Sequence, residues 1–425
     1  MAIQINESEL ISSKKFANVV KSLYGDVSVE VAAKRFAALY KTHQTDFGED
    51  GDFFSSPGRI EIIGNHTDHN NGKVVAGAIS VDTLAVASKN GSDIISFRSE
   101  GYPAMLVDVN HTKVRADEYG KSVALVRGVV NYFVNNGYKV GGFNASAVSD
   151  VAKGAGVSSS SSFEVLIAEI LNVYFNDGKV SEVVKAQASQ YAENVYFNKP
   201  CGLLDQSAIS LGGVSYIDFK DTTKPEIKHY HWNFDNLKIV VVNTGGNHSN
   251  LTDAYASIRE EMEEVAKYFN KSVLREVTKE EFYSNIVNLK KQFNGRALLR
   301  AIHYFEENER VDCAVDAIVN TNEDLFCNMI EKSGLSSETK LQNYRVDTDI
   351  DELISLGVNY SKTIEGVKAS RVHGGGFAGT IISYVAKDAV DNYCQKMKDL
   401  FGEKNIFVMS IRESGACKVE VLWEI

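Results

Sequence analysis

The sequence predicts an α+β protein of two domains, and three observations support this. First, the chain of 425 residues is too long for one ordinary domain and is long enough for two. Second, helical and strand patterns are mixed without the strict alternation that is typical of parallel α/β folds. Third, the polar segment 221–236, which contains Pro225, separates two regions that each contain apolar strands. We therefore expect a first domain over residues 1–225 and a second over residues 226–425.

The composition is typical of a globular protein and argues against several functional classes. Hydrophobic residues make up 44% of the chain and charged residues 24%, which is sufficient for a sizeable core. The net charge of -11, with Lys and Arg interleaved among Asp and Glu, argues against a nucleic-acid partner. The sequence contains neither a signal-peptide core nor an apolar stretch of membrane-spanning length. The five cysteines are widely spaced, which indicates reduced thiols. We expect a cytoplasmic protein without a membrane association or an obligate protein partner.

Apolar periodicity predicts the elements of both domains in chain order. In the first domain we expect two helices over 8–42, strands over 53–63 (broken at Pro57-Gly58) and 74–89, a helix over 122–136, a strand over 143–148, helices beginning near 163 and over 180–196, and a strand over 213–219. In the second we expect a strand over 237–242, helices to about 368, a strand over 380–385, a helix over 386–400 and two short terminal strands.

A glycine–serine segment leads directly into the helix predicted near residue 163 and is typical of a phosphate-binding loop. Backbone N–H groups at a helix start lack intrahelical partners, and the helix dipole favours an anion there. The segment lacks the lysine of a Walker A loop, but its serine hydroxyls could bind phosphate, cap the helix or coordinate Mg²⁺. A flexible linker is the alternative, although linkers seldom join a strand to an amphipathic helix so directly. The segment consists of Gly154, Ala155, Gly156, Val157, Ser158, Ser159, Ser160, Ser161 and Ser162.

A polar cluster follows the strand predicted over 53–63 and fits a ligand with many hydroxyl groups. Each sugar hydroxyl needs a donor and an acceptor, and carboxylate, imidazole and amide side chains together supply both. Two alternatives stay open. The His-x-Asp-His spacing could bind a metal, although no second Cys/His group accompanies it, and Asn-Asn-Gly sequences also form plain polar turns. The cluster consists of Asn65, His66, Asp68, His69, Asn70 and Asn71.

Two further segments contain candidate functional residues. Asp205 lies among apolar residues shortly after Gly202, and a half-buried carboxylate is a candidate general base. Asp205 could equally cap the next helix. Glycines 374–376 precede a predicted strand and could form a backbone nest for phosphate, although a tight turn also explains them.

The order and spacing of these segments resemble the galactokinases within the GHMP family of small-molecule kinases. Residues 57–72 resemble the galactokinase signature PGRVNLIGEHTDYNGG. Residues 154–160 resemble the GHMP nucleotide motif PxGxGLSSSA, and residues 201–206 resemble CGIMDQ. Residues 243–255 are similar to the DTxxxHS…Y segment, and residues 371–379 are similar to R-x-T-G-G-G-F-G-G. The first motif is specific for galactokinases, whereas the nucleotide motif and CGIMDQ are shared across the GHMP family.

The resemblance implies a role for each matching residue. Asp205 would be the general base that takes the proton from the anomeric hydroxyl of the sugar. Arg59 would keep Asp205 ionised and stabilise charge on the transferring phosphoryl group. Residues 154–160 would hold the ATP phosphates, and Mg²⁺ would be bound by Glu193 and by Ser160 or Ser159. The sugar pocket would be lined by Asn65, His66, Asp68, Gly202, Asp205 and Tyr255, with Gly374, Gly375 and Gly376 closing over phosphate and sugar.

The resemblance also implies the fold and the reaction. The fold would combine a ribosomal S5 domain 2-like N-terminal domain with a ferredoxin-like C-terminal domain, with the active site between them. The substrates would be ATP and galactose, which would be phosphorylated at its C1 hydroxyl. The chain departs from the motifs at Asn65 (usually Glu), at His69 (usually Tyr) and at Ala152 (usually Pro), and the helix near residue 122 lacks the usual aromatic residue. Asn65 motivates one alternative, a GHMP kinase for N-acetylgalactosamine, galacturonate or arabinose. A non-catalytic sugar and ATP sensor is the other, but the catalytic groups are present.

Overall fold

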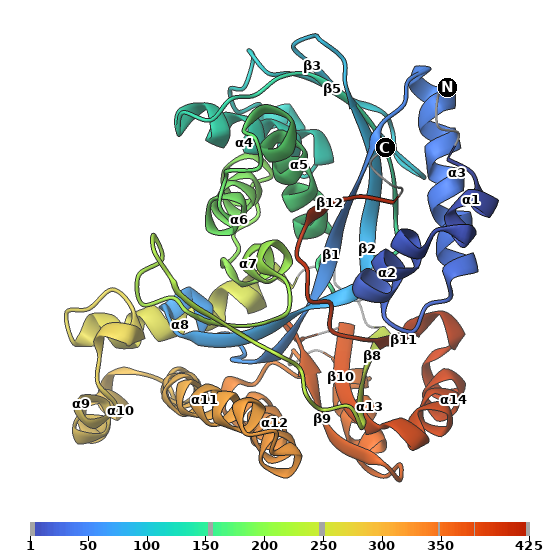
Figure 1. The fold of residues 1–425 in the computed structure, drawn as a ribbon. Helices are drawn as coiled ribbons and strands as arrows, with labels where there is room; N and C mark the ends of the chain where they lie inside the picture. Colours follow the sequence, from blue (N-terminus) through green and yellow to red (C-terminus); the bar gives the residue numbers. More distant parts are fainter. Residues whose placement is uncertain (1–4, 152–155, 246–250, 347–348, 378, 422–425) are drawn as a thin grey trace.

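The larger of two sheets forms the centre of the molecule (Figure 1). A computed structural model describes residues 5–151, 156–245, 251–346, 349–377 and 379–421. The strands of this sheet are β1 (Asp52–Ile63), β2 (Lys73–Lys89), β3 (Ile94–Ser99), β4 (Met105–Asp108), β5 (Phe143–Ser149), β6 (Val214–Asp218), β7 (Glu226–Tyr230) and β12 (Cys417–Val419). In the described residues their order is β12-β1-β2-β5-β3-β4, with β6 paired to β2 and β7 paired to β6.

Helices cover both faces of this sheet, because successive side chains of a strand point to opposite faces. Phe53 of β1 packs in the apolar cluster of the N-terminal helices, whereas Phe54 packs in the cluster on the other face. The N-terminal helices are α1 (Glu7–Ser12), α2 (Lys14–Tyr24) and α3 (Val29–Phe47). The opposite group, which Figure 1 shows on the far side of β1 and β2, is α4 (Ser122–Asn135), α5 (Ser159–Phe175), α6 (Glu182–Tyr191) and α7 (Leu204–Leu211).

The second sheet also lies between two groups of helices. Its strands, in the order β11-β8-β10-β9, are β8 (Leu237–Gly245), β9 (Val367–His373), β10 (Gly379–Ala386) and β11 (Ile406–Met409). Val241 packs with α11 (Gly295–Val319) and α12 (Glu323–Ser336), whereas Val242 packs with α13 (Leu353–Lys362) and α14 (Val390–Phe401). The remaining helices, α8 (Thr252–Tyr268), α9 (Lys279–Ser284) and α10 (Ile286–Gln292), pack together with α11.

The two sheets share one buried apolar cluster, and this junction positions the site. Ile60 and Ile62 of β1 pack in the same cluster as Ile239 of β8 and Ile382 of β10. In addition, β7 and β12 belong to the predicted second domain, residues 226–425, but pair within the first sheet. The division of the chain at residue 225 stays a prediction, since sheet membership does not follow that boundary.

The predicted mixture of helices and strands is confirmed, but the strands β3, β4 and β7 were not expected, and the first strand differs from its prediction. We expected a break at Pro57-Gly58, but β1 runs continuously through it, with a shift of the β1–β2 register between Pro57 and Arg59. Such a bulge absorbs the irregular residues without ending the strand. Across the described ranges, we find no helix with the length and apolarity that a bilayer span requires.

Candidate active site

Segments that are far apart in the sequence meet at one cavity of about 280 Å³. Arg59 of β1, the start of α5, Asp205 of α7 and the glycine loop after β9 all contribute to its wall. Further lining residues are Lys199, Tyr255, His373 and Thr380. The structure therefore brings together the predicted phosphate loop, the predicted base and the third glycine motif.

Arg59 reaches this cavity because β1 approaches the phosphate loop closely. The N–H group of Arg59 donates to the Val157 carbonyl at 3.2 Å. A side chain at Gly58 could not be accommodated, since a Cβ atom there would lie 2.9 Å from the same carbonyl. The Arg59 guanidinium also donates to the carbonyl of Gly156. The Pro-Gly-Arg sequence thus fixes the distance between β1 and the loop.

Arg59 and Asp205 form a bidentate ion pair at the centre of the site. Arg59 Nε donates to Asp205 Oδ1 and Nη2 donates to Oδ2, each at 2.7 Å. Asp205 is the second residue of α7 and does not cap that helix. Burial by itself would raise the pKa of Asp205, but the charge and hydrogen bonds of Arg59, together with the Ser158 hydroxyl, lower it. Asp205 is therefore an ionised carboxylate with about 33% of its side chain exposed.

The start of α5 supplies backbone and hydroxyl groups to the cavity. Ser158, immediately before the helix, has a positive φ of 61° and its hydroxyl donates to Asp205 Oδ2. Gly156 also has a positive φ, and a Cβ atom there would lie 2.3 Å from Thr380 Oγ1. Together with Ser159 and Ser160, these residues line the cavity. Gly154 and Ala155 lie outside the described residues.

A buried acidic group adjoins the serines. Ser160 Oγ donates to Glu193 Oε1 at 3.2 Å, and Glu193, which is 2% exposed, lies in the π-helical turn after α6. Gln206 Nε2 lies between Glu193 and Glu164, and Glu164 Oε1 is buried without a partner in the described residues. Burial and the neighbouring Glu193 charge raise the pKa of Glu164 well above its usual range.

These oxygen atoms suit a hard divalent cation. A hydroxyl and a carboxylate are ligands that Mg²⁺ accepts, and Mg²⁺ usually takes its remaining ligands from water and substrate phosphates. A self-contained metal cage of three or more His, Cys, Asp or Glu side chains is not found in the part of the chain that the structure describes. Ser160 and Glu193 therefore fit a cation that arrives with a nucleotide. Lys199 Nζ contacts Glu193 Oε1 at 2.8 Å.

Asp68 and Gly202 lie against each other, outside the wall of the small cavity. Asp68 begins a 3₁₀ turn, Asp68–Asn70, after β1. A Cβ atom at Gly202 would lie 1.8 Å from Asp68 Oδ2, so glycine is required for this approach. Burial, followed by the charges of Asp205 and Glu61, raises the pKa of Asp68 to about 7.

Asn65 and His66 contact the glycine loop. Asn65 is completely buried, and its Nδ2 donates to the Gly374 carbonyl at 2.7 Å. His66 Nε2 lies 2.9 Å from the Gly375 carbonyl, which can only accept, so this nitrogen carries the proton. Burial lowers the pKa of His66, which keeps the ring neutral. The assignment of both residues to the sugar stays a prediction.

Tyr255 holds the other side of the same loop. Its hydroxyl donates to the Gly376 carbonyl at 2.9 Å, and its ring packs edge-on against Phe377 with 5.4 Å between ring centroids. A Cβ atom at Gly375 would lie 2.5 Å from the Tyr255 ring. The close approach of loop and ring therefore depends on glycine at this position.

Sequence reasoning missed several residues of the site. Lys199 lies only six residues after Glu193, and no sequence pattern assigned it a role. His373 stands where the family motif has Thr, and it accepts the N–H of Glu61 at 3.1 Å. Burial, with the nearby Arg59 and Arg371 charges, lowers the pKa of His373, so it is neutral. Its departure from the motif was the signal that could have identified it.

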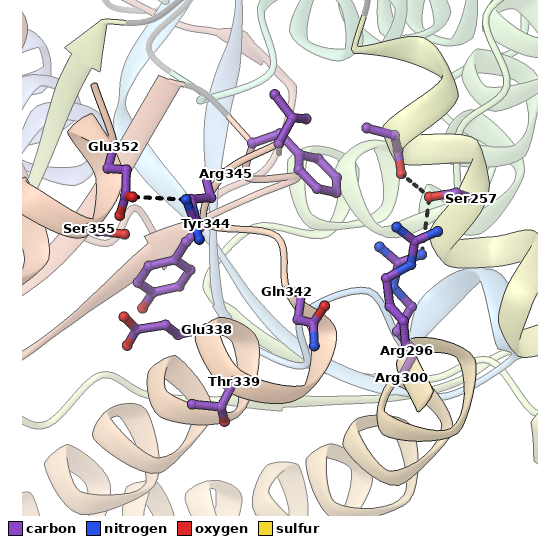
Figure 2. A pocket seen from close by; sticks show the side chains of 13 residues that line it. Ser257, Arg296, Arg300, Glu338, Thr339, Gln342, Tyr344, Arg345, Glu352 and Ser355 are labelled. Carbon is purple, nitrogen blue, oxygen red and sulfur yellow. Dashed lines mark hydrogen bonds and ion pairs between the residues drawn. The ribbon is translucent and has the colours of Figure 1, made fainter. Parts of the chain in front are cut away.

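A larger cavity, of about 460 Å³, contains none of the residues that we expected in the site. Figure 2 shows Ser257, Arg296 and Arg300 on one side and Arg345 with Glu352 on the other. Its arginines are paired with acids: Arg345 contacts Glu352 at 2.9 Å, and Arg296 and Arg300 both contact Glu261. Its lining residue Phe377 packs against Tyr255, whereas Arg59 and Asp205 line the smaller cavity, so we assign the chemistry to the smaller cavity.

Comparison with known proteins defines the class of this chain. Residues 124–213 match the family model of the GHMP kinases N terminal domain, and residues 41–89 match the galactokinase galactose-binding signature. A solved mevalonate kinase shares the fold, with a TM-score of 0.59 at 14% identity over 84% of this chain and 98% of that one. The fold is that of a GHMP kinase.

Relatives with higher identity define the family more narrowly. A galactokinase of Clostridium tetani (strain Massachusetts / E88) is 30% identical over 82% of this chain and 88% of its own length. A galactokinase of Bacillus subtilis (strain 168) is 28% identical over 83% and 89%, respectively. Lactococcus lactis galactokinase, solved with galactose, superposes with a TM-score of 0.79 at 26% identity, covering 90% of this chain and all of that one. The chain belongs to the galactokinase family, and it is a sugar kinase.

Proposed function

We propose that this protein transfers the γ-phosphoryl group of ATP to the C1 hydroxyl of D-galactose, which yields galactose 1-phosphate and ADP. The observation that supports this most strongly is the Arg59–Asp205 pair, which lies in one cavity with the start of α5. Phosphoryl transfer needs an oriented acceptor, an anion-binding loop and positive charge near the transferring group. The match to the galactose-binding signature supports galactose as the acceptor.

Asp205 acts as the general base in this reaction. Its lowered pKa keeps it ionised at neutral pH, so it can accept the proton of the C1 hydroxyl as that oxygen attacks the γ-phosphorus. Arg59 holds the carboxylate in place with two hydrogen bonds, and its charge stabilises the negative oxygens of the transferring group. The two residues therefore work as one unit.

The nucleotide is held by residues 154–160 at the start of α5. Unpaired N–H groups and the helix dipole favour the ATP phosphates there. Ser160 and Glu193 would hold Mg²⁺, with Ser159 as the neighbouring hydroxyl. Magnesium bound with ATP neutralises phosphate charge.

The sugar site lies between the polar turn after β1 and the segment that precedes α7. We propose that His66, Asp68, Gly202 and Tyr255 contact the sugar, with Gly375 above it. Asp68 is suited to this role because it begins the 3₁₀ turn and its carboxyl group approaches Gly202 directly.

The domain division, the location in the cell and the absence of a protein partner are also proposals. We propose two domains, 1–225 and 226–425, a cytoplasmic location and no obligate protein partner. All five cysteines are free thiols, which is typical of a reducing compartment.

A panel of sugars in a coupled ADP-release assay tests the proposed reaction. We expect galactose to be turned over with a higher kcat/KM than N-acetylgalactosamine, galacturonate or arabinose, and the product to carry phosphate at C1. A higher kcat/KM for one of the other sugars would replace galactose as the substrate. ADP release without any sugar dependence would contradict sugar kinase activity altogether.

A further inference from the structure

Two polar residues of the first motif have exchanged places relative to the galactokinase signature. In PGRVNLIGEHTDYNGG the fifth residue is Asn and the ninth is Glu. This chain has Glu61 at the fifth position and Asn65 at the ninth. The amide and the carboxylate are both kept, but the negative charge has moved by four residues.

The two side chains contact each other in the folded protein. Asn65 Nδ2 lies 3.1 Å from Glu61 Oε1 and 3.3 Å from Glu61 Oε2. In a straight strand, residues four apart would be separated by about 13 Å. They meet because the chain turns at Gly64, which has a φ of 111° and whose Cβ position lies 2.7 Å from the Lys73 carbonyl.

The charge at residue 61 is matched by Arg371 of β9. Arg371 Nη2 donates to Glu61 Oε1 at 3.0 Å and to the carbonyls of Glu61 and Ile62, each at 2.9 Å. The side chains are 0% and 8% exposed. A buried guanidinium without its acidic partner is strongly unfavourable, so Glu61 is needed where it stands.

The Asn65 amide has no hydrogen-bonding capacity left for a sugar. Its two N–H groups are directed to Glu61 and to the Gly374 carbonyl. Its oxygen accepts from Ser337 Oγ at 3.2 Å and from Asn343 Nδ2 at 2.9 Å. An amide offers two donors and two acceptor sites, and protein groups occupy all four.

These contacts fix the orientation of the glycine loop. The Gly374 carbonyl faces Asn65, and the Gly375 carbonyl accepts from His66 and Asn343. In a trans peptide the next N–H group points opposite to the carbonyl, so the N–H groups of Gly375 and Gly376 point away from the first motif. Within the described ranges neither has a protein acceptor, and both residues line the cavity that contains Asp205.

We propose that Glu61 and Asn65 form a positioning pair that orients the Gly374–Gly376 loop for phosphoryl transfer, and that Asn65 does not contact the sugar. The pair links β1, through Arg371 and Gly374, to the end of β9 and to the start of the turn that leads to β10. The proposal rests on the proposed kinase activity. It replaces the sugar contact that the family resemblance implies for residue 65.

Reciprocal substitution in the full chain tests the pair. Asn65→Glu would place a second carboxylate beside Glu61 and remove the donor to Gly374, and Glu61→Asn would leave Arg371 unpaired. We expect each single variant to lower kcat at saturating ATP and galactose at least tenfold, with KM for galactose changed less than threefold. The double variant, which restores the order of the signature, should recover kcat at least tenfold over the poorer single variant.

Two controls keep the result interpretable. Asn172→Ser removes a buried amide near the end of α5 that accepts from the Val180 N–H and does not contact the loop, and it should lower the thermal midpoint while kcat stays near that of the unmodified protein. Glu61→Gln keeps the shape and serves as the charge test if Glu61→Asn does not fold.

The outcomes distinguish a failure of the positioning pair from a failure of the proposed reaction. If Asn65→Glu raises KM for galactose with kcat unchanged, or if the double variant is no better than the poorer single variant, the positioning pair is wrong. If the unmodified protein prefers another sugar, only the proposed substrate fails, and the same four proteins assayed with that sugar still test the pair.

Discussion

Asp205 and Asp68 are neighbouring carboxylates whose surroundings shift their pKa values in opposite directions. Both lose solvent on folding, which by itself raises a carboxyl pKa. At Asp205 the bidentate contact with Arg59 and the Ser158 hydroxyl outweigh the effect of burial, so the pKa falls. Asp68 has no such cation among the described residues. Burial and repulsion by the negative charge of Asp205 therefore raise its pKa to about 7. Paired acids with separated pKa values indicate separate roles: Asp205 is suited to be the base, and Asp68 to be a hydrogen-bonding group that titrates near neutrality.

The largest expected effect is at Asp205. Asp205→Asn removes the base and keeps the size of the side chain, although its amide nitrogen can no longer accept from Arg59 or Ser158. We expect kcat to fall at least about 100-fold, the usual scale for a lost general base, while ATP affinity measured by calorimetry changes little. Near-normal turnover would remove Asp205 from this role and would leave Asp68 to be tested.

The next effect concerns the cation that distinguishes the two carboxylates. Arg59→Lys keeps one charge but loses the bidentate geometry, and we expect kcat to fall roughly tenfold. The folded-state pKa of Asp205 is depressed by Arg59, so weakening this contact should move the acid limb of the kcat profile to higher pH.

A matched pair outside the site provides the control for this change. Arg35 contacts Asp82 at 2.6 Å, and neither residue lines the cavity that contains Asp205. Arg35→Lys should lower stability and leave the pH profile where it is. An acid limb that stays fixed in Arg59→Lys would contradict our account of the Asp205 pKa.

The third effect tests the close approach at Asp68. Gly202→Ala would place a Cβ atom on Asp68 Oδ2, which must move the carboxyl group. We expect KM for galactose to rise roughly tenfold, equivalent to about 1.4 kcal/mol, with a smaller change in kcat. Gly295→Ala is the control, because its Cβ would have no atom within 4 Å. Equal kinetics for the two variants would show that Asp68 does not depend on glycine 202.

The smallest effect is a pH dependence. Sugar hydroxyls that donate to Asp68 bind its ionised form more tightly, so sugar affinity should increase as pH rises through about 7. KM for galactose should therefore fall roughly threefold between about pH 6 and pH 8, less than the tenfold limit for one pKa unit. Asp68→Asn should abolish this trend, and a KM independent of pH in the unmodified protein would contradict it.

Local sequence patterns predicted only those features of the site that a single segment forms by itself. The glycines before the α5 periodicity predicted a loop at a helix start, and Ser159 begins that helix. The pattern of five serines did not indicate that Ser158 would bond to Asp205, because hydroxyl direction depends on the positive φ at that residue. Lys199 was missed for a related reason, since its contact with Glu193 depends on how the chain leaves the π-helical turn.

The sequence by itself determined the class of fold, the order of the motifs and the residue types available for phosphoryl transfer, because periodicity and glycine content act over short distances. The tertiary structure decided which carboxylate is ionised, since the pKa of Asp205 depends on Arg59, which lies 146 residues away in the chain. It also decided that Asn65 turns back to Glu61 and the glycine loop. Charge and burial are set by neighbours in space, and a linear pattern does not specify those neighbours.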